Sequence, residues 1–138
     1  MHRHSMAGMA LLAVALVAAC GSKAKVGGTT TGKVTAIDLG RSVNPDRTIT
    51  ASTDTFAPTD TIYAVVQTET LGGAKLKVRW TYEDGQTVNE STQNLPSSGG
   101  TIWSEFHVSK PDGWPIGKYH LQVSLDSAAA GVKEFTVK

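Results

Sequence analysis

The sequence predicts an all-β sandwich of about seven to eight short antiparallel strands. Three observations support this prediction. Several segments alternate apolar and polar residues with a period of two, which places successive side chains on opposite faces of a strand. Turn-forming Gly, Pro, Asn and Asp residues separate these segments, and after residue 20 no segment keeps a helical period. Short strands of this kind bury their apolar faces by packing as two sheets.

The first expected strands span residues 33–39 and 47–51, with the turn signal Asn44-Pro45-Asp46 between them. The next expected strand, residues 61–68, differs from them because it carries apolar side chains on both faces. These side chains are Ile62, Ala64 and Val66 on one face and Tyr63 and Val65 on the other. We therefore expect this strand at the centre of its sheet.

Residues 75–82 show the strongest alternation in the chain. Leu76, Val78, Trp80 and Tyr82 lie on one face, and three charged residues and a threonine lie on the other. The pair Asp84-Gly85 then predicts a two-residue hairpin turn, because Gly tolerates the positive φ that this turn requires. The returning strand, residues 87–93, is mostly polar, as is usual for an edge strand.

Three further strands are expected at residues 101–109, 118–126 and 132–137. In the first of them the apolar face consists of Ile102, Phe106 and Val108, so Trp103, Glu105 and His107 should point outward. In the other two the apolar faces consist of Tyr119, Leu121, Val123 and Leu125, and of Phe135 and Val137.

The segment Pro115-Ile116-Gly117-Lys118-Tyr119, together with Trp80 inside the strongest strand, resembles the immunoglobulin-like and fibronectin-III-like modules of bacterial surface proteins over residues 33–138. The resemblance implies an immunoglobulin-like β-sandwich. It also implies that Tyr119 forms a tyrosine corner, in which the hydroxyl bonds the nearby backbone. The two cysteines of the antibody inter-sheet disulfide are absent, since Cys20 is the single cysteine of the chain.

An export signal is predicted at the N-terminus. Residues 1–6 carry one fixed positive side chain, Arg3, and residues 7–19 carry no charge. As a helix, residues 7–19 would rise about 20 Å, which is too short to span a hydrocarbon core of about 30 Å. We therefore expect residues 1–19 to be a cleaved signal peptide.

The run Val17-Ala18-Ala19-Cys20 resembles the lipobox of bacterial lipoproteins, in which an aliphatic residue and two small ones precede an obligatory cysteine. The resemblance implies that the leader is cut before Cys20, that its sulfur takes a diacylglyceryl group and that its amine is acylated, for example with palmitate. Two or three acyl chains anchor a protein stably in a membrane. The competing interpretation is an ordinary secretory leader that ends in a cysteine by chance.

Residues 20–32 are predicted to be the lipidated cysteine and a flexible linker, because they are rich in Gly, Ser and Thr. Residues 33–138 form one predicted domain. The chain has 13 Lys and Arg and 12 Asp and Glu, and only Arg3 falls in the leader, so the mature chain is formally neutral. No basic patch is present to favour nucleic acid. Gly21 and Ser22 also lack the aspartate that retains enteric lipoproteins in the inner membrane, so the resemblance favours the outer membrane in a Gram-negative host.

Catalytic and metal sites are not expected. Only His107 and His120 follow the leader, no serine has a nucleophile-elbow pattern, and lipid would block Cys20. Glu105 and His107 share one strand face, but a metal site would also need His120. The implied topology places His120 in the opposite sheet. We therefore expect no enzyme activity and no metal or other cofactor.

The candidate binding surface consists of Trp103, Glu105 and His107, with Trp114 in the loop that follows. Trp103 is either an exposed contact residue or covered by a neighbour, and Trp114 is either a plug of the sandwich or a ligand platform. We expect a membrane-anchored cell-envelope lipoprotein that acts as a non-catalytic protein-interaction or structural module, with an unidentified envelope protein as partner. The alternative is carbohydrate or small-ligand binding through Trp103 and Trp114.

Overall fold

A computed structural model describes residues 24–138 of the chain, and these residues form nine strands and no helix. The strands in chain order are β1 (Lys25–Val26), β2 (Gly32–Gly40), β3 (Thr55–Phe56), β4 (Ile62–Thr70), β5 (Lys75–Tyr82), β6 (Gln86–Asn94), β7 (Gly100–Val108), β8 (Gly117–Leu125) and β9 (Ala128–Val137). Within this part of the chain, no helix is long and apolar enough to cross a membrane.

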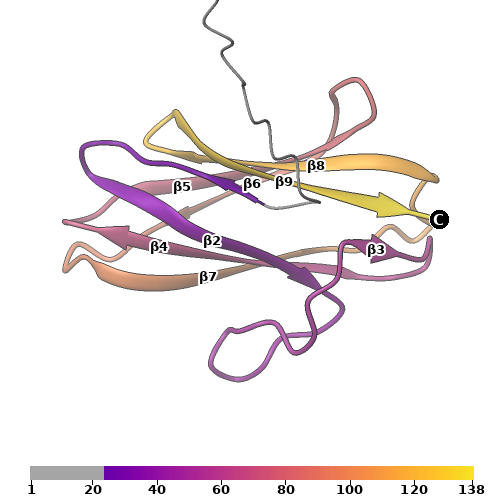
Figure 1. The fold of residues 1–138 in the computed structure, drawn as a ribbon, viewed down its shortest axis with the longest axis horizontal. Helices are drawn as coiled ribbons and strands as arrows, with labels where there is room; N and C mark the ends of the chain where they lie inside the picture. The colour runs from indigo at the N-terminus through magenta and orange to yellow at the C-terminus, as the bar shows by residue number, and fades with distance from the viewer. Residues whose placement is uncertain (1–23) are drawn as a thin grey trace, which may run out of the picture.

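The strands form two sheets that face each other (Figure 1). The larger sheet has the order β1-β9-β8-β5-β6, and the smaller has the order β2-β4-β7. All pairings within these orders are antiparallel, and β3 adds a short parallel pairing to β9. The chain therefore changes sheet after each of the first four strands, and again after β6 and after β7. The all-β prediction is confirmed, but the strand number is nine and one pair is parallel.

The core between the sheets consists of the apolar faces that the alternation predicted. Leu76, Val78 and Trp80 of β5 are each 0 % exposed, and Leu121 and Val123 of β8 lie beside them. Part of this core is an aromatic cluster that consists of Phe56, Trp80, Trp114, Tyr119 and Phe135. Each fully buried large side chain contributes roughly 1.5–3 kcal/mol relative to an exposed one.

Tyr119 forms the predicted tyrosine corner. Its ring is fully buried, and its hydroxyl donates a hydrogen bond of 2.5 Å to the carbonyl oxygen of Pro115, four residues earlier. Burial, together with the neighbouring Tyr82 and Glu83, raises the pKa of the Tyr119 hydroxyl to about 12. The hydroxyl therefore remains a neutral donor, and its hydrogen bond holds the loop before β8 against the start of that strand.

Residues 47–51 do not form the strand that the sequence predicted. They belong to a loop that leaves β2, and a single bridge from Val43 to Ile49 is their only ladder-like pairing. Arg47 has a φ of 67°, and Asn44 bonds the backbone of Thr48, so this segment is bent into a turn. The predicted turn between β5 and β6 also differs, since it contains three residues and Glu83 as well as Gly85 adopts a positive φ.

The predicted linker at residues 20–32 is wrong from Lys25 onward, because this part of the chain is folded. Lys25 and Val26 pair with Val132 and Gly131 of β9. The amide of Gly27 also donates a hydrogen bond of 2.7 Å to the carbonyl of Ala130. A side chain at Gly131 would collide with the carbonyl oxygen of Lys25, so glycine permits this close pairing. The folded domain thus includes β1, and Cys20 lies outside the described residues.

Candidate functional site at the edge of strand β7

Strand β7 is one of the two outer strands of the smaller sheet, and its outward side chains are those that the alternation predicted. We call Trp103, Glu105 and His107 the β7 surface. Trp103 is 39 % exposed, which makes it one of the few large apolar side chains open to solvent in the described chain. Arg47 reaches it from the loop after β2, with its guanidinium 3.5 Å from the carbonyl oxygen of Trp103. The surface therefore combines an aromatic ring with charged groups.

Glu105 and His107 contact each other on this surface. The Glu105 carboxylate lies 2.7 Å from Nδ1 of His107, and the His107 ring packs against Tyr63 of β4 with centroids 5.2 Å apart. The glutamate is half-buried and the histidine is exposed. This pair presents hydrogen-bonding groups to a ligand.

Behind the β7 surface, a groove of about 250 Å³ separates β7 from β6. We call it the β6–β7 groove. Each of these strands is an outer strand of its own sheet, so the groove marks one open side of the sandwich. Gln93 of β6 spans it, donating a hydrogen bond of 2.8 Å to the carbonyl of Glu105. The lining residues are Trp80, Asn89, Ser91, Gln93, Glu105, Phe106, His107 and Val108.

The indole of Trp80 stands out among the groove residues. The side chain is 0 % exposed, yet its Nε1–H has no hydrogen-bond partner among residues 24–138. A buried donor without a partner costs about 1–3 kcal/mol. Trp114 shows that the same core can satisfy an indole, since its Nε1 donates to the carbonyl of Asp60 at 2.9 Å.

Trp114 does not belong to a binding surface. Its ring is 2 % exposed and packs between Trp80 and Tyr119 in the aromatic cluster, so it is a plug of the sandwich. The loop before β8 turns inward here because the amide of Trp114 bonds the carbonyl of Pro58 and the indole bonds Asp60. The sequence-based alternative was a ligand platform that uses Trp103 and Trp114 together. It is wrong for Trp114, because this side chain is buried.

The structure keeps His120 away from Glu105 and His107. His107 lies on β7 in the smaller sheet, whereas His120 lies on β8 in the larger sheet and contacts Glu134, with Nε2 3.2 Å from its carboxylate. The opposite-sheet prediction for these two strands is confirmed. Within residues 24–138, no group of three or more His, Cys, Asp or Glu side chains is placed to hold a metal ion.

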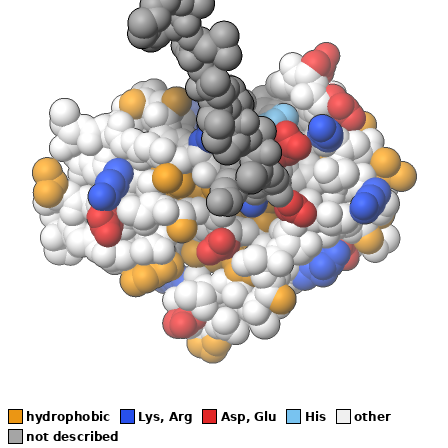
Figure 2. All heavy atoms as spheres, in the orientation of Figure 1, with side chains coloured by type: hydrophobic (Ala, Val, Ile, Leu, Met, Phe, Trp, Pro, Cys, Tyr) orange, Lys and Arg blue, Asp and Glu red, His pale blue; other side chains and the backbone are white. Residues whose placement is uncertain are grey.

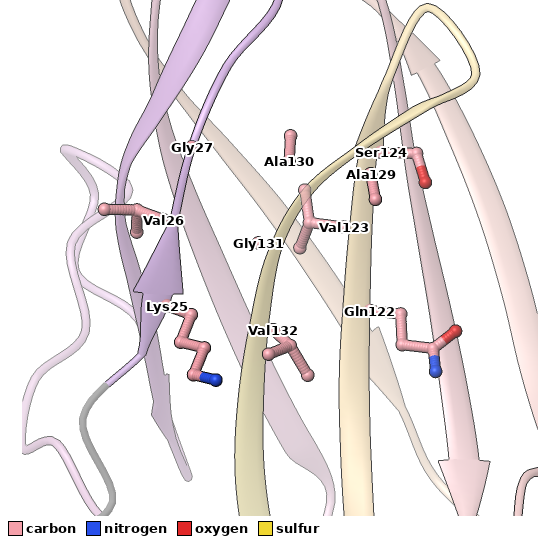
Figure 3. Close-up of a pocket in the computed structure, with 10 residues that line it drawn as sticks. All are labelled: Lys25, Val26, Gly27, Gln122, Val123, Ser124, Ala129, Ala130, Gly131 and Val132. Atoms are coloured by element: carbon pink, nitrogen blue, oxygen red, sulfur yellow. The ribbon is translucent and has the colours of Figure 1, made fainter.

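Two other hollows are larger. The larger, about 580 Å³, runs along β1, β9 and β8 and is lined largely by small side chains and backbone (Figure 3). Lys25 is its only charged lining residue. The second, about 410 Å³, adjoins Thr70 and the exposed Leu71. The buried Thr70 hydroxyl also lacks a described partner, but a hydroxyl can rotate toward one, whereas the direction of an indole N–H is fixed by its ring.

The charged side chains of the domain are mixed in sign. Figure 2 shows Lys and Arg interspersed with Asp and Glu on the face that it displays, with apolar side chains scattered between them. Several of these charges pair, for example Lys77 and Arg79 with Glu90 across β5 and β6. Such a surface gives no strong field of either sign for attracting a charged partner.

The sequence analysis missed the β6–β7 groove, although it contained a signal. Asn89, Ser91 and Gln93 are register partners of the buried residues Trp80, Val78 and Leu76, so they occupy positions on the core-facing side of β6. Polar residues at core-facing positions indicate either a gap or a site. The polarity of this strand was interpreted only as that of an edge.

Comparison with known proteins identifies the fold. No protein-family model and no curated protein sequence matches the chain. Among solved structures, the C-terminal domain of Wzt aligns with a TM-score of 0.55 at 8 % identity, covering 86 % of this chain and 78 % of that one. A Niemann-Pick type C2 protein from the Japanese carpenter ant aligns with a TM-score of 0.52 at 10 % identity, covering 83 % and 98 %. At these identities the likeness shows architecture alone, and the described domain is an immunoglobulin-like β-sandwich.

Proposed function

We propose that the chain is a lipid-anchored lipoprotein of the cell envelope whose sandwich is a non-catalytic binding module, with the β7 surface as its contact site for an envelope protein. The exposed ring of Trp103 on an outer strand carries this proposal. Aromatic side chains bury a large area at little entropic cost, and for this reason they dominate many protein interfaces. Glu105 and His107 would add hydrogen bonds around the ring.

The position of β1 supports the presentation of this surface away from the membrane. Cys20 would carry the lipid, and the five residues from there to Lys25 span at most about 18 Å. The β1 edge would therefore lie close to the membrane. β1 and β2 lie on one side of the sandwich, and β6 and β7 lie on the other. Four strand spacings separate β1 from β6, about 19 Å, so the β7 surface would face away from the anchor.

The anchor is tested by fractionating cells that express the wild type or Cys20→Ser. The wild type should sediment with membranes and carry the mass of the added acyl chains, whereas the variant should appear in the soluble fraction, because its serine cannot accept the thioether-linked diacylglyceryl group. Equal retention of both proteins in the membrane pellet would contradict lipidation at Cys20.

The contact site is tested by photo-crosslinking in intact cells, with benzoylphenylalanine in place of Trp103 or, as a control, in place of Ile116. Ile116 is also an exposed apolar residue, but it lies in the loop before β8. A discrete crosslinked protein from position 103 alone is the expected result. The same set of proteins at both positions, or none at position 103, would count against the β7 surface.

A further inference from the structure

We infer that a basic hollow on the outer face of the larger sheet binds one phosphate group, the headgroup phosphate of a phospholipid in the membrane that Cys20 would enter. We call it the β5–β8 hollow. It holds about 200 Å³ and is lined by Lys77, Arg79, Gln122, Ser124 and Ser127. The phosphate contact rests on these residues alone, and only its assignment to a lipid rests on the anchor proposed at Cys20.

The first argument is the arrangement of hydrogen-bond donors around the hollow. Lys77 is the register partner of Ser124, and Arg79 is the register partner of Gln122, so these four side chains form a rectangle on one face of β5 and β8. Its sides are about 4.8 Å between the strands and about 7 Å along them. Ser124 is short and leaves space between the longer side chains, and Ser127 adds a hydroxyl from the turn before β9. Phosphate offers acceptor oxygens to all of these donors.

The second argument is the balance of charge beside the hollow. Lys77 and Arg79 share one carboxylate, that of Glu90, with Nζ and Nε at 3.0 Å and 2.9 Å from its oxygens. The three side chains therefore keep one net positive charge, and Glu90 leaves the terminal guanidinium nitrogens of Arg79 unused. Neither Glu90 nor Asp126 lines the hollow, and Asp126 accepts hydrogen bonds elsewhere. Binding would depend on these short contacts rather than on a long-range field.

The third argument is the position of the hollow relative to the expected anchor. Lys25, Val132, Gln122 and Arg79 are successive register partners across β1, β9, β8 and β5. Arg79 thus lies three strand spacings, about 14 Å, from Lys25 on the same face. Because Lys25 would lie close to the membrane, this face can rest on the lipid headgroups. The β7 surface belongs to the other sheet and stays open to an envelope protein.

The surface between Lys25 and the β5–β8 hollow permits such a close approach. The larger hollow along β1, β9 and β8 shares Gln122 and Ser124 with the basic one, and small or apolar side chains supply most of its remaining lining (Figure 3). Val26, at its β1 side, is 48 % exposed. A basic hollow beside small and apolar side chains matches the amphipathic chemistry of a phospholipid better than that of a free anion.

The phosphate site is tested by an NMR titration of the purified Cys20→Ser protein with inorganic phosphate, and with acetate as a comparison. This variant makes the result independent of lipidation. The Nε–H signal of Arg79 should shift saturably with phosphate and more weakly with acetate. Arg79→Gln should reduce the affinity roughly tenfold or more, as expected for the loss of a charged hydrogen bond. Lys33→Gln is the matched control, because it removes the same charge from β2 in the smaller sheet.

A second pair of variants protects this test against misfolding and gives a change of opposite sign. Lys77→Gln should also weaken phosphate binding, whereas Glu90→Gln should tighten it several-fold, because a competing negative charge is removed. Far-UV circular dichroism verifies that each variant folds. No saturable shift with phosphate, equal weakening by Lys33→Gln, or no gain in affinity for Glu90→Gln would overturn the site.

The lipid source is tested separately by co-sedimentation of the Cys20→Ser protein with vesicles of phosphatidylcholine, alone or mixed in equal parts with phosphatidylglycerol. The protein should prefer the anionic vesicles, Arg79→Gln should abolish this preference, and Lys33→Gln should keep it. Phosphate binding without a preference for anionic vesicles would overturn the lipid assignment and identify a free phosphate compound as the ligand. An equal preference in all variants would place the membrane contact elsewhere and overturn it as well.

Discussion

Replacing Trp80 with alanine should destabilise the domain strongly, whereas the same change at Trp103 should not. Trp80 is completely buried and lies 5.9 Å from Phe135 and 6.3 Å from Trp114 between ring centroids. Removing a large core aromatic costs about 3–5 kcal/mol. The variant also loses an unsatisfied donor, which returns part of about 1–3 kcal/mol, and water can enter from the groove. We therefore expect a loss near 3 kcal/mol.

This loss is large against the total stability of a domain, which is about 5–15 kcal/mol. For Trp103→Ala, the partly exposed ring has less area to lose, and we expect about 1 kcal/mol or less. Urea unfolding followed by far-UV circular dichroism measures both values, since each variant lacks a fluorophore. The midpoint should fall while the slope stays constant. A loss below about 1 kcal/mol for Trp80→Ala, or equal losses for both variants, would refute the assignment of core and surface.

Three further predictions concern the turns and the surface charges. Tyr119→Phe should cost about 1 kcal/mol by removing the bond to Pro115. The pKa of Tyr119 is about 12 in the folded protein against a usual 10.0, so the free energy of unfolding of the wild type should fall as pH rises from 10.0 to about 12. The same fall in Tyr119→Phe would contradict the role of the buried hydroxyl. Gly117→Ala should lower the free energy of unfolding by at least about 1 kcal/mol, because φ is 147° and the new methyl group would collide with Glu83. An unchanged free energy of unfolding would show that the turn relaxes. Hydrogen bonds from Arg79 and Lys77 on β5 lower the pKa of Glu90, so the stability that Glu90 contributes should be lost as pH falls below 4.5. Glu90→Gln should lack this loss. The same decrease of unfolding free energy with falling pH in both proteins would contradict this pairing.

Much of the larger sheet could be predicted from sequence because its strands follow one local rule. β5 and β8 alternate strictly, and each pairs with the other in the register that buries both apolar faces. The mostly polar composition of β6 correctly indicated an edge strand, and the apolar faces of β4 correctly indicated a central strand. A period of two needs no knowledge of the partner strand, so it is visible in the sequence alone.

The elements that were missed depend on residues far away in the chain. β1 is only two residues long, and its pairing requires the absence of a side chain at Gly131, more than a hundred residues later. Residues 47–51 have a strand-like composition, but the positive φ of Arg47 turns the chain away from the sheet. The groove beside Trp80 depends on how the outer strands of two different sheets meet. Local patterns carry none of this information.

The polarity of β6 follows from its edge position on both of its faces. Charge on the outward face discourages pairing with another chain, and Glu90 with its partners on β5 supplies it. Asn89 and Ser91 are register partners of Trp80 and Val78, but Asn89 is exposed and Ser91 is half-buried, because the sandwich is open between β6 and β7. Water therefore reaches these two side chains, and their polarity is compatible with the stability of the sandwich.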